Sequence, residues 1–382
     1  MPEQGVSHKK ITPKQIRRTN RKLIYDYIYR HGPVSQMNLA VSLRLSRPTV
    51  ASNLTDLEEN GLISKTGQID SDNVGRKASA YQICPQYKVS IGVDILEQKV
   101  RVVALSLRGK IIAIEAYPLA YSNEDAYYRR VCELITGFIH QSGFDPQQIL
   151  GIGVAVPGLV SPDGTTVTYG KILSCTGLNV DSFSRHLPYP CILTHDANAS
   201  AVSELWVTPE LTNAVVLVLN KHLGASVISN GQIQYGKHGH TGTVEHMLIY
   251  PKGRLCYCGK RGCLETLISI SALLKENETL EDFFRRRDEG DKEVLGRWVA
   301  YMEELAKAVN NLHLVNDVDI VLAGDLSGFL KQSDIDRLYE LVRECNAFEE
   351  ESDFIFISRM PEHYVSTGAG LYYISRFLDN PV

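Results

Sequence analysis

One histidine and three cysteines with the spacing of a metal site lie close together in this chain. They are His246, Cys256, Cys258 and Cys263, in the segment HMLIYPKGRLCYCGKRGC. Zn2+ prefers four nitrogen and sulfur ligands in a tetrahedron, and this set supplies all four. Three glycines in the segment permit the tight turns that bring three thiolates onto one ion. A site with four protein ligands and no open position predicts structural rather than catalytic zinc.

The alternatives for these cysteines are a disulfide or ordinary core thiols. The 382-residue chain begins with no apolar run that resembles a signal peptide, and no stretch reaches the length of a membrane span. The other five cysteines are isolated, as in proteins of a reducing compartment. We therefore expect a cytoplasmic protein without a membrane partner, in which zinc is favoured over a disulfide.

Charge is distributed unevenly along the chain. Residues 1–80 hold 13 Lys and Arg against 7 Asp and Glu, a net of +6, whereas the remainder holds 27 against 37, a net of −10. A small basic head on an acidic body is expected where only the head meets a polyanion.

Helical patterns in residues 16–61 predict a helix-turn-helix in this head. The last helix follows Ser46, an N-cap residue type, and Val50, Leu54 and Leu57 recur at i, i+4 and i+7 on its core side. We predict that its opposite face presents side chains able to bond phosphates and base edges in a major groove. This predicted DNA-binding set is Ser46, Arg47, Thr49, Ser52 and Asn53.

Two alternating segments, 62–67 and 76–83, predict a β-hairpin after the helices. Helix-turn-helix plus hairpin is a winged helix-turn-helix, and its wing carries Arg76 and Lys77, which we add to the predicted DNA contacts. Some winged helices bind proteins instead. The basic head and the polar recognition face favour a double-stranded DNA operator.

Strand and helix patterns alternate from residue 88 onward. Three strands followed by an α/β region occur twice, which predicts an α/β body of two lobes with a ligand cleft between them. The predicted domains are a winged helix-turn-helix at 1–83, a first lobe at 84–195 completed by a C-terminal helix at 366–382, and a second lobe at 196–365 that holds the zinc site.

With these motifs the chain resembles the ROK family (repressors, open reading frames and sugar kinases), and specifically its winged-helix repressor branch. The resemblance spans essentially the whole chain. Its most specific motif is YPKGRLCYCGKRGCLE at 250–265, and PGLVSPDG at 157–164 and HDANASA at 195–201 agree with it. The resemblance implies an actin-like sugar-kinase fold behind the DNA-binding head.

The resemblance also implies roles for individual residues. Kinases of the family carry an Asn-Asp pair where this chain has His195 and Asp196, and their aspartate is the base for the sugar hydroxyl. Glu265 matches a glutamate that contacts sugar, and His246 would serve both metal and sugar. A carboxylate such as Asp196 still accepts hydrogen bonds from sugar hydroxyls when no phosphate is transferred.

One segment departs from the family pattern. The family writes Gly-Glu-x-Gly-His before the zinc site, and here these positions read Gly242-Thr243-Val244-Glu245-His246. Thr243 stands in the place of the sugar-binding glutamate, and Glu245 stands in the place of a glycine. Either Glu245 supplies the missing contact from another direction, or the ligand is not an ordinary hexose.

The phosphate loops depart more strongly, which argues against kinase activity. Where family kinases carry Asp-x-Gly-Gly-Thr-Lys, this chain reads Asp94 to Lys99 as DILEQK, and its second loop, 220–224, reads NKHLG. Asp325 replaces a glycine of the third loop. Glycines let backbone N–H groups approach an anion, so bulky and acidic replacements obstruct and repel ATP. We expect no enzymatic activity.

These observations predict a transcriptional regulator, most simply a repressor of carbohydrate-utilisation genes that a sugar or sugar derivative in the cleft controls. The expected assembly is a homodimer or homotetramer, because winged-helix regulators bind near-palindromic sites. One alternative is a sugar kinase with a regulatory head, which Asp196 supports. Another is a repressor that responds to a protein partner, which the altered 242–246 segment supports.

Overall fold

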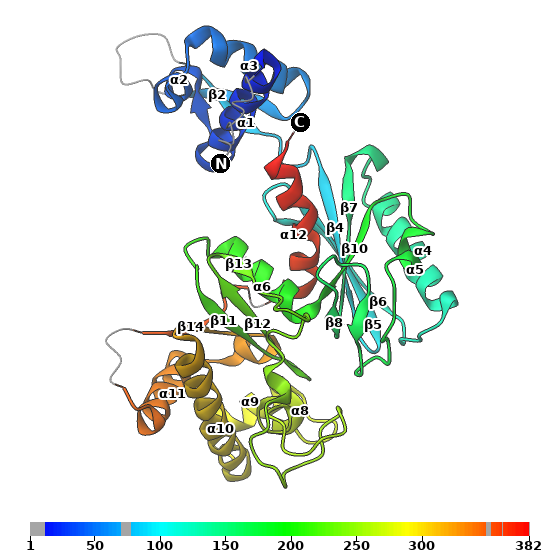
Figure 1. Ribbon diagram of the computed structural model, residues 1–382, viewed down its shortest axis with the longest axis vertical. Coiled ribbons are helices and arrows are strands. Elements are labelled where there is room, and N and C mark those ends of the chain that lie inside the picture. Colours follow the sequence, from blue (N-terminus) through cyan, green and yellow to red (C-terminus); the bar gives the residue numbers. More distant parts are fainter. Residues whose placement is uncertain (1–11, 70–77, 349–352, 361, 382) are drawn as a thin grey trace, which may run out of the picture. The chain divides into compact units, whose positions relative to one another are not determined.

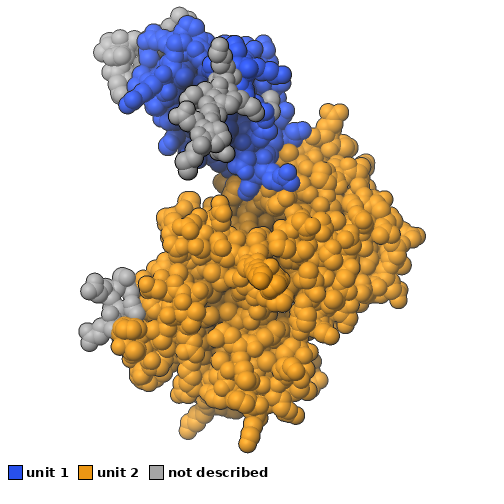
Figure 2. Space-filling view, in the orientation of Figure 1, with its two compact units in different colours: residues 1–89, 106–108, 374–382 blue, residues 90–105, 109–373 orange. Residues whose placement is uncertain are grey.

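The computed structural model describes residues 12–69, 78–348, 353–360 and 362–381. The chain divides into two compact units (Figure 2). Unit 1 comprises residues 1–89, 106–108 and 374–382, and unit 2 comprises residues 90–105 and 109–373. No helix in the described part of the chain is long and apolar enough to cross a membrane.

Unit 1 is built on three helices and a three-stranded sheet. The helices are α1 (Pro13–His31), α2 (Gln36–Leu43) and α3 (Arg47–Glu59). The strands β1 (Val34–Ser35), β2 (Ile63–Ile69) and β3 (Ala78–Ile83) pair in the order β1-β3-β2, and both pairings are antiparallel.

Short polar side chains begin each helix of unit 1. The side chains of Thr12, Ser35 and Ser46 accept hydrogen bonds from backbone N–H groups three residues later, so they satisfy donors that have no partner within the helix. Gly61, with φ of +73°, follows the last helix in the left-handed conformation that glycine adopts without strain. The predicted cap at Ser46 is thus confirmed.

The core of unit 1 comes from all three helices and from the sheet. Burying one such apolar side chain contributes roughly 1.5–3 kcal/mol relative to leaving it exposed. Phe377 and Leu378, near the C-terminus of the chain, pack against the same core. Its largest fully buried members are Tyr25, Ile24, Ile28, Leu39, Leu54, Leu57, Leu62, Ile63 and Ile83.

Unit 2 contains two five-stranded sheets. The first has the order β10-β7-β4-β5-β6 and, with its helices, forms what we call the first lobe. Strands β10 and β7 are parallel, and β5 and β6 are antiparallel. Its elements are β4 (Val89–Ile95), β5 (Lys99–Ser106), β6 (Ile111–Pro118), α4 (Asp125–Gln141), β7 (Ile149–Val156), a hairpin of β8 (Leu159–Val160) and β9 (Val167–Tyr169), α5 (Asp181–Ser184) and β10 (Cys191–His195).

The second sheet has the order β13-β12-β11-β14-β15 and forms the second lobe with the helices around it (Figure 1). Strand β11 is antiparallel to β12 and parallel to β14. The strands are β11 (Ala214–Leu219), β12 (Leu223–Ser229), β13 (Gln232–Ile233), β14 (Asp319–Ala323) and β15 (Ile355–Ile357). The helices are α7 (Glu265–Ile268), α8 (Ile270–Leu273), α9 (Leu280–Asp288), α10 (Lys292–Asn316) and α11 (Gln332–Cys345).

Two helices, α6 (Asp196–Val207) and α12 (Tyr364–Asp379), share a core with strands of both sheets. Glycines let these elements approach closely. A side chain at Gly368 of α12 would collide with the Ala199 carbonyl of α6, and one at Gly92 of β4 would collide with the Ser366 carbonyl of α12. From Ile374 onward, residues of α12 belong to unit 1, so this helix runs from one unit into the other.

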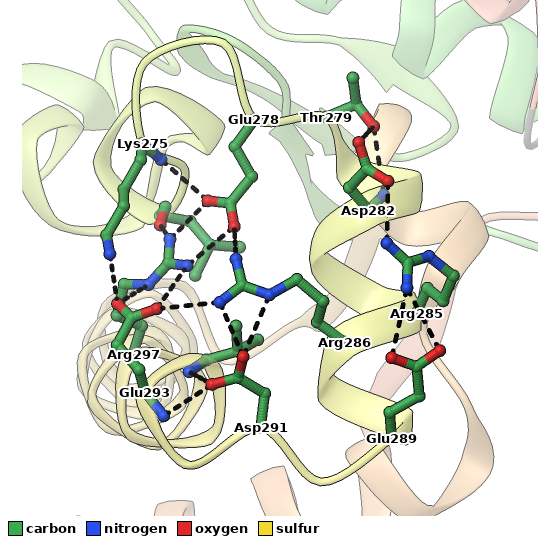
Figure 3. Close-up of polar contacts among 12 residues, drawn as sticks. Lys275, Glu278, Thr279, Asp282, Arg285, Arg286, Glu289, Asp291, Glu293 and Arg297 are labelled. Atoms are coloured by element: carbon green, nitrogen blue, oxygen red, sulfur yellow. Dashed lines mark hydrogen bonds and ion pairs between the residues drawn. The ribbon is translucent and has the colours of Figure 1, made fainter.

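A network of ion pairs fastens α9 to α10 in the second lobe (Figure 3). Its hub is Glu278, whose side chain is 8% exposed. The two terminal guanidinium nitrogens of Arg297 donate to it at 2.7 and 2.9 Å, Arg286 donates at 3.0 Å, and so does the backbone N–H of Lys275. The hydrogen bonds from Arg297 are the main reason that the pKa of Glu278 falls from 4.5 to about 2.

We expect Glu278→Gln to lower the free energy of unfolding by about 2 kcal/mol at pH 7, because it weakens several charge-assisted hydrogen bonds. A depressed pKa stabilises the fold fully above pH 4.5, and this contribution is lost as the pH falls toward about 2. In urea unfolding, the free energies of unfolding of the wild type and Glu278→Gln should therefore converge as the pH falls from 4.5 toward about 2. The control is Glu289→Gln, which affects only an exposed pair with Arg285. An equal loss in both variants would contradict the hub role.

Candidate functional site

Helix α3 presents the polar face that the sequence predicts for DNA recognition. Ser46, Arg47 and Ser52 are exposed, and Thr49 is partly exposed. The Ser46 hydroxyl also caps the helix, accepting the N–H of Thr49 at 3.2 Å. One guanidinium nitrogen of Arg47 lies 3.3 Å from the sulfur of Met37 on α2, which leaves its other donors available.

The prediction that Asn53 faces outward is wrong. Its side chain is 4% exposed, and its amide nitrogen donates to the Thr49 carbonyl at 2.8 Å. Asn53 lies three residues after Val50 and four before Leu57, so the helical period turns it toward the core. Arg76 and Lys77, the predicted wing contacts, lie outside the described residues.

The four predicted metal ligands come together in unit 2. One ligand atom from each of His246, Cys256, Cys258 and Cys263 lies within 4.8 Å of all the others. The sulfurs of Cys258 and Cys263 are 3.8 Å apart, as are the Cys256 sulfur and Nδ1 of His246. Two thiolates each about 2.3 Å from one tetrahedral ion would be separated by about 3.8 Å. The cluster therefore has the spacing of a four-coordinate metal site.

Tight backbone turns hold this cluster. Residues Leu248 and Cys263 form an isolated bridge, and Gly262 has φ of +79°. A side chain at Gly262 would collide with the carbonyl oxygen of Tyr250. The cysteines are all free thiols, so the disulfide alternative is not realised.

A cavity lies between the two lobes of unit 2, next to the His/Cys cluster. Polar side chains gather there from the β10–α6 junction, the β11–β12 turn, the end of β9 with the residues after it, and the segment before the cluster. Its lining includes three predicted sugar-binding residues, His195, Asp196 and Glu245. The prediction missed Tyr169, Lys171, His222 and Tyr257, which also line it.

Asp196 is the first residue of α6, at the edge of this cavity. Its Oδ1 accepts the N–H of Ala197 at 2.8 Å and lies 3.2 Å from Nε2 of His195. Burial raises the pKa of Asp196 and lowers that of His195, because both charged forms lose solvation. The second oxygen of Asp196 has no hydrogen bond that would compete with a ligand hydroxyl, among the contacts of the described chain.

Glu245 and His246 bring two unpaired polar atoms to the same region. Glu245 is 6% exposed, and burial raises its pKa to about 8. Its Oε2 and Nε2 of His246 are buried without a hydrogen-bond partner in the described part of the chain. A buried unpaired polar atom costs about 1–3 kcal/mol, which a ligand hydroxyl would relieve.

His246 and Glu265 do not appear in the lining of the cavity, unlike the other three predicted sugar residues. Both carboxylate oxygens of Glu265 are already paired: Oε1 lies 2.8 Å from Nδ1 of His222, and Oε2 accepts the N–H of Leu223 at 2.7 Å. A ligand that reaches Glu265 must displace one of these partners. The direct contact from Glu265 to sugar stays a prediction.

Residues of the three altered phosphate loops form hydrogen bonds with one another. Lys221 donates to Glu97 at 2.5 Å, and Asn220 accepts hydrogen bonds from the Asp325 N–H and the Tyr364 hydroxyl. Burial raises the pKa of Asp94, beside these loops, to about 7. These contacts join the three altered loops to one another and to α12.

Comparisons with known proteins were made for the whole chain. The model of the ROK family matches residues 90–356, and the model of winged helix-turn-helix DNA-binding domains matches residues 17–64. The DNA-binding transcriptional dual regulator NagC of Escherichia coli (strain K12) is 26% identical over 337 residues, 82% of each chain. The xylose repressor of Bacillus subtilis (strain 168) is 26% identical over 269 residues, 70% of each chain.

Solved structures agree on the fold. A ROK family transcriptional regulator, a homologue of the Escherichia coli Mlc protein, superposes with a TM-score of 0.75 at 20% identity, covering 96% of this chain and 97% of that one. A ROK family glucokinase from Streptomyces griseus superposes with a TM-score of 0.65 at 19% identity, covering 74% of this chain and 98% of that one. The glucokinase therefore shares the fold of the larger part of this chain, and the superposition does not cover the remainder of this chain.

Proposed function

Because the chain belongs to the ROK family, we propose that it is a DNA-binding transcriptional repressor controlled by a carbohydrate in the cavity of unit 2. The single observation that carries this proposal is the joint presence of a winged helix-turn-helix at residues 17–64 and a ROK body at 90–356. Relatives of the chain are named DNA-binding transcriptional dual regulator NagC, N-acetylglucosamine repressor and xylose repressor.

The DNA-binding arm of the proposal rests on helix α3. Arg47 and Ser52 are exposed on a helix whose other side is fixed by Val50, Leu54 and Leu57. Arginine donates in a bidentate geometry to guanine, and serine bonds bases or phosphates. The expected partner is a near-palindromic duplex bound by a homodimer or homotetramer, since a single recognition helix reads only one half-site.

The effector arm rests on the polar lining of the cavity. Asp196 offers acceptors, His195 and Lys171 offer donors, and the carboxyl of Glu245 can do both when it is protonated, which is the mixture that hydroxyl-rich ligands require. The unpaired oxygen of Glu245, a residue of the cavity lining, supports a ligand hydrogen bond that protein groups do not supply. The proposed effector is a sugar or sugar derivative.

The His/Cys cluster fits Zn2+, and we propose structural zinc there. His246, Cys256, Cys258 and Cys263 would hold it, and no ligand position would remain for a substrate. When bound, such an ion contributes folding free energy and fixes the backbone around it. The ring of His246 lies beside the carboxyl of Glu245, with 3.9 Å between Nε2 and Oε1. An ion bound to His246 would therefore also fix the orientation of this ring next to Glu245.

Catalysis is not part of the proposed function, although Asp196 occupies the position of a kinase base. The second phosphate loop carries Asn220, Lys221 and His222, and the first carries Glu97, where ATP needs glycine backbone. Two relatives that match 82% and 70% of this chain are named as a transcriptional regulator and a repressor. Sugar-dependent ATP hydrolysis that disappears in Asp196→Asn would overturn this part of the proposal.

The first test is a titration of operator binding with sugars, using a duplex selected from random sequences by the purified protein. One of D-xylose, D-glucose, N-acetyl-D-glucosamine or their phosphates should change the affinity for DNA. We expect Asp196→Asn to raise the sugar concentration that gives half of this change by about 10- to 150-fold. This is the loss of affinity typical of removing a hydrogen bond to a charged group. Its affinity for the operator without sugar should equal that of the wild type.

The matched control is Asp181→Asn, which removes an exposed carboxylate of unit 2 at the start of α5, outside the cavity lining. It should respond to the sugar as the wild type does. DNA binding that no sugar changes would refute the effector arm, and a protein that selects no duplex would refute the whole proposal.

A further inference from the structure

The three residues between β11 and β12 contact three separate parts of unit 2. Asn220, Lys221 and His222 form this turn, which we call the relay loop. Its backbone is anchored to the start of α8, where the Asn220 carbonyl accepts the N–H of Ile270 at 2.8 Å and the Lys221 carbonyl accepts the Ser271 hydroxyl at 2.6 Å. Because the turn is short, a shift of its backbone moves all three side chains together.

Lys221 joins the two lobes. Its ammonium donates at 2.5 Å to Glu97, which lies in the turn between β4 and β5 of the first lobe, 124 residues earlier in the chain. This hydrogen bond lowers the pKa of Glu97. Both side chains are exposed, so the pair is weak enough to open and close.

Asn220 ties the relay loop to the third altered loop and to α12. Its side-chain oxygen accepts the Asp325 N–H at 2.7 Å and the Tyr364 hydroxyl at 2.8 Å. Tyr364 is 5% exposed, and its hydroxyl also lies 2.9 Å from Asp325. A hydroxyl has a single proton, so it can donate to only one of these two acceptors at a time.

His222 carries the third contact, at the ligand cavity. Its Nδ1 lies 2.8 Å from Glu265, and its ring packs edge-on against Tyr257 at 5.1 Å. Both His222 and Tyr257 line the cavity. Asn220 also lines it, so two side chains of the loop lie at the cavity, and Lys221 between them contacts the opposite lobe.

We propose that the relay loop couples the occupancy of the cavity to the arrangement of the two lobes. A ligand that competes for His222 or Glu265 moves the loop and weakens the pair between Lys221 and Glu97. By reciprocity, opening that pair changes the affinity of the cavity for the ligand. This inference rests on the proposed function in one respect, because it takes the ligand of the cavity to be the effector of a regulator.

The test is hydrogen–deuterium exchange of the full-length protein without ligand, because exchange rates report local opening. Lys221→Met should raise exchange in residues 94–99 by about two- to fivefold, the range expected for loss of an exposed ion pair. His222→Phe touches only the second lobe, and yet it should raise exchange in the same first-lobe segment. The charge reversal Glu97→Lys with Lys221→Glu should restore the wild-type rate.

The matched control is Lys331→Met, which removes an equally exposed ion pair, with Asp288, inside the second lobe. It should leave exchange in residues 94–99 unchanged. Two results would overturn the relay: unchanged exchange of that segment in Lys221→Met, or an effect of His222→Phe confined to residues 220–224 and 265–268.

Selection of duplexes by the wild-type protein separates this inference from the proposed function. If the exchange results are as expected and no duplex is selected, the relay stands and the regulatory role fails. If a duplex is selected and the sugar response is intact while His222→Phe leaves residues 94–99 unchanged, the regulatory role stands and the relay fails.

Discussion

Cys258→Ser is expected to lose stoichiometric zinc and to unfold far more readily than the wild type. The expected drop in the free energy of unfolding is about 4 kcal/mol or more, because loss of a structural metal belongs to the most disruptive class of single substitutions. Three remaining ligands hold the ion less tightly, and the turns around Gly262 lose their cross-link. Metal content by mass spectrometry and unfolding in urea measure the two effects.

Cys345→Ser is the matched control for this experiment. Cys345 is an exposed free thiol at the end of α11, outside the His/Cys cluster. It should keep both zinc content and stability. Full zinc content in Cys258→Ser would show that the ligand set is wrong, and zinc loss without loss of stability would show that the ion is not structural.

Arg47→Ala is expected to weaken specific DNA binding by about 5- to 150-fold. Loss of a bidentate contact to one base costs about 1–3 kcal/mol and relaxes specificity at that base pair. Binding to unrelated duplexes should fall much less, because it depends on phosphate contacts made by many basic residues. Fluorescence anisotropy with the selected duplex and with a scrambled duplex gives both affinities.

Arg129→Ala provides the comparison, since Arg129 is an exposed arginine of α4 in unit 2 that pairs with Asp125. Its DNA affinity should match that of the wild type. An unchanged affinity in Arg47→Ala would remove Arg47 from the recognition surface. An equal fall for both duplexes would reassign Arg47 to phosphate binding.

Much of the fold follows from local patterns. The sequence predicts a helix near 124–142, and α4 spans Asp125–Gln141. The three strands expected from residue 88 onward are β4, β5 and β6. The predicted winged helix-turn-helix, followed by an actin-like ROK body, is confirmed by the family matches and by the shared fold of the related regulator. Periodicity and capping suffice for these elements because neighbours along the chain determine them.

The His/Cys cluster was also predictable, because its four residues lie within one segment of 18 residues. Tyr257, which lines the cavity, stands between two of those cysteines, so its place in the motif was an available signal. Tyr169 and Lys171 had no such signal, since they come from a separate hairpin region. Asn53 was misplaced although its spacing from Val50 and Leu57 already pointed toward the core.

The sequence by itself determined the character of the protein: a basic helix-turn-helix head, an α/β body, a zinc-type ligand set and phosphate loops without their glycines. Only the tertiary structure decided which carboxylates are available to a ligand. Glu245 keeps an unpaired oxygen, whereas both oxygens of Glu265 are held by His222 and Leu223. The pairing of His222 with Glu265 joins residues 43 positions apart, and the pairing of Lys221 with Glu97 joins residues 124 positions apart. Local periodicity carries no information at that range, because chain folding alone brings those groups together.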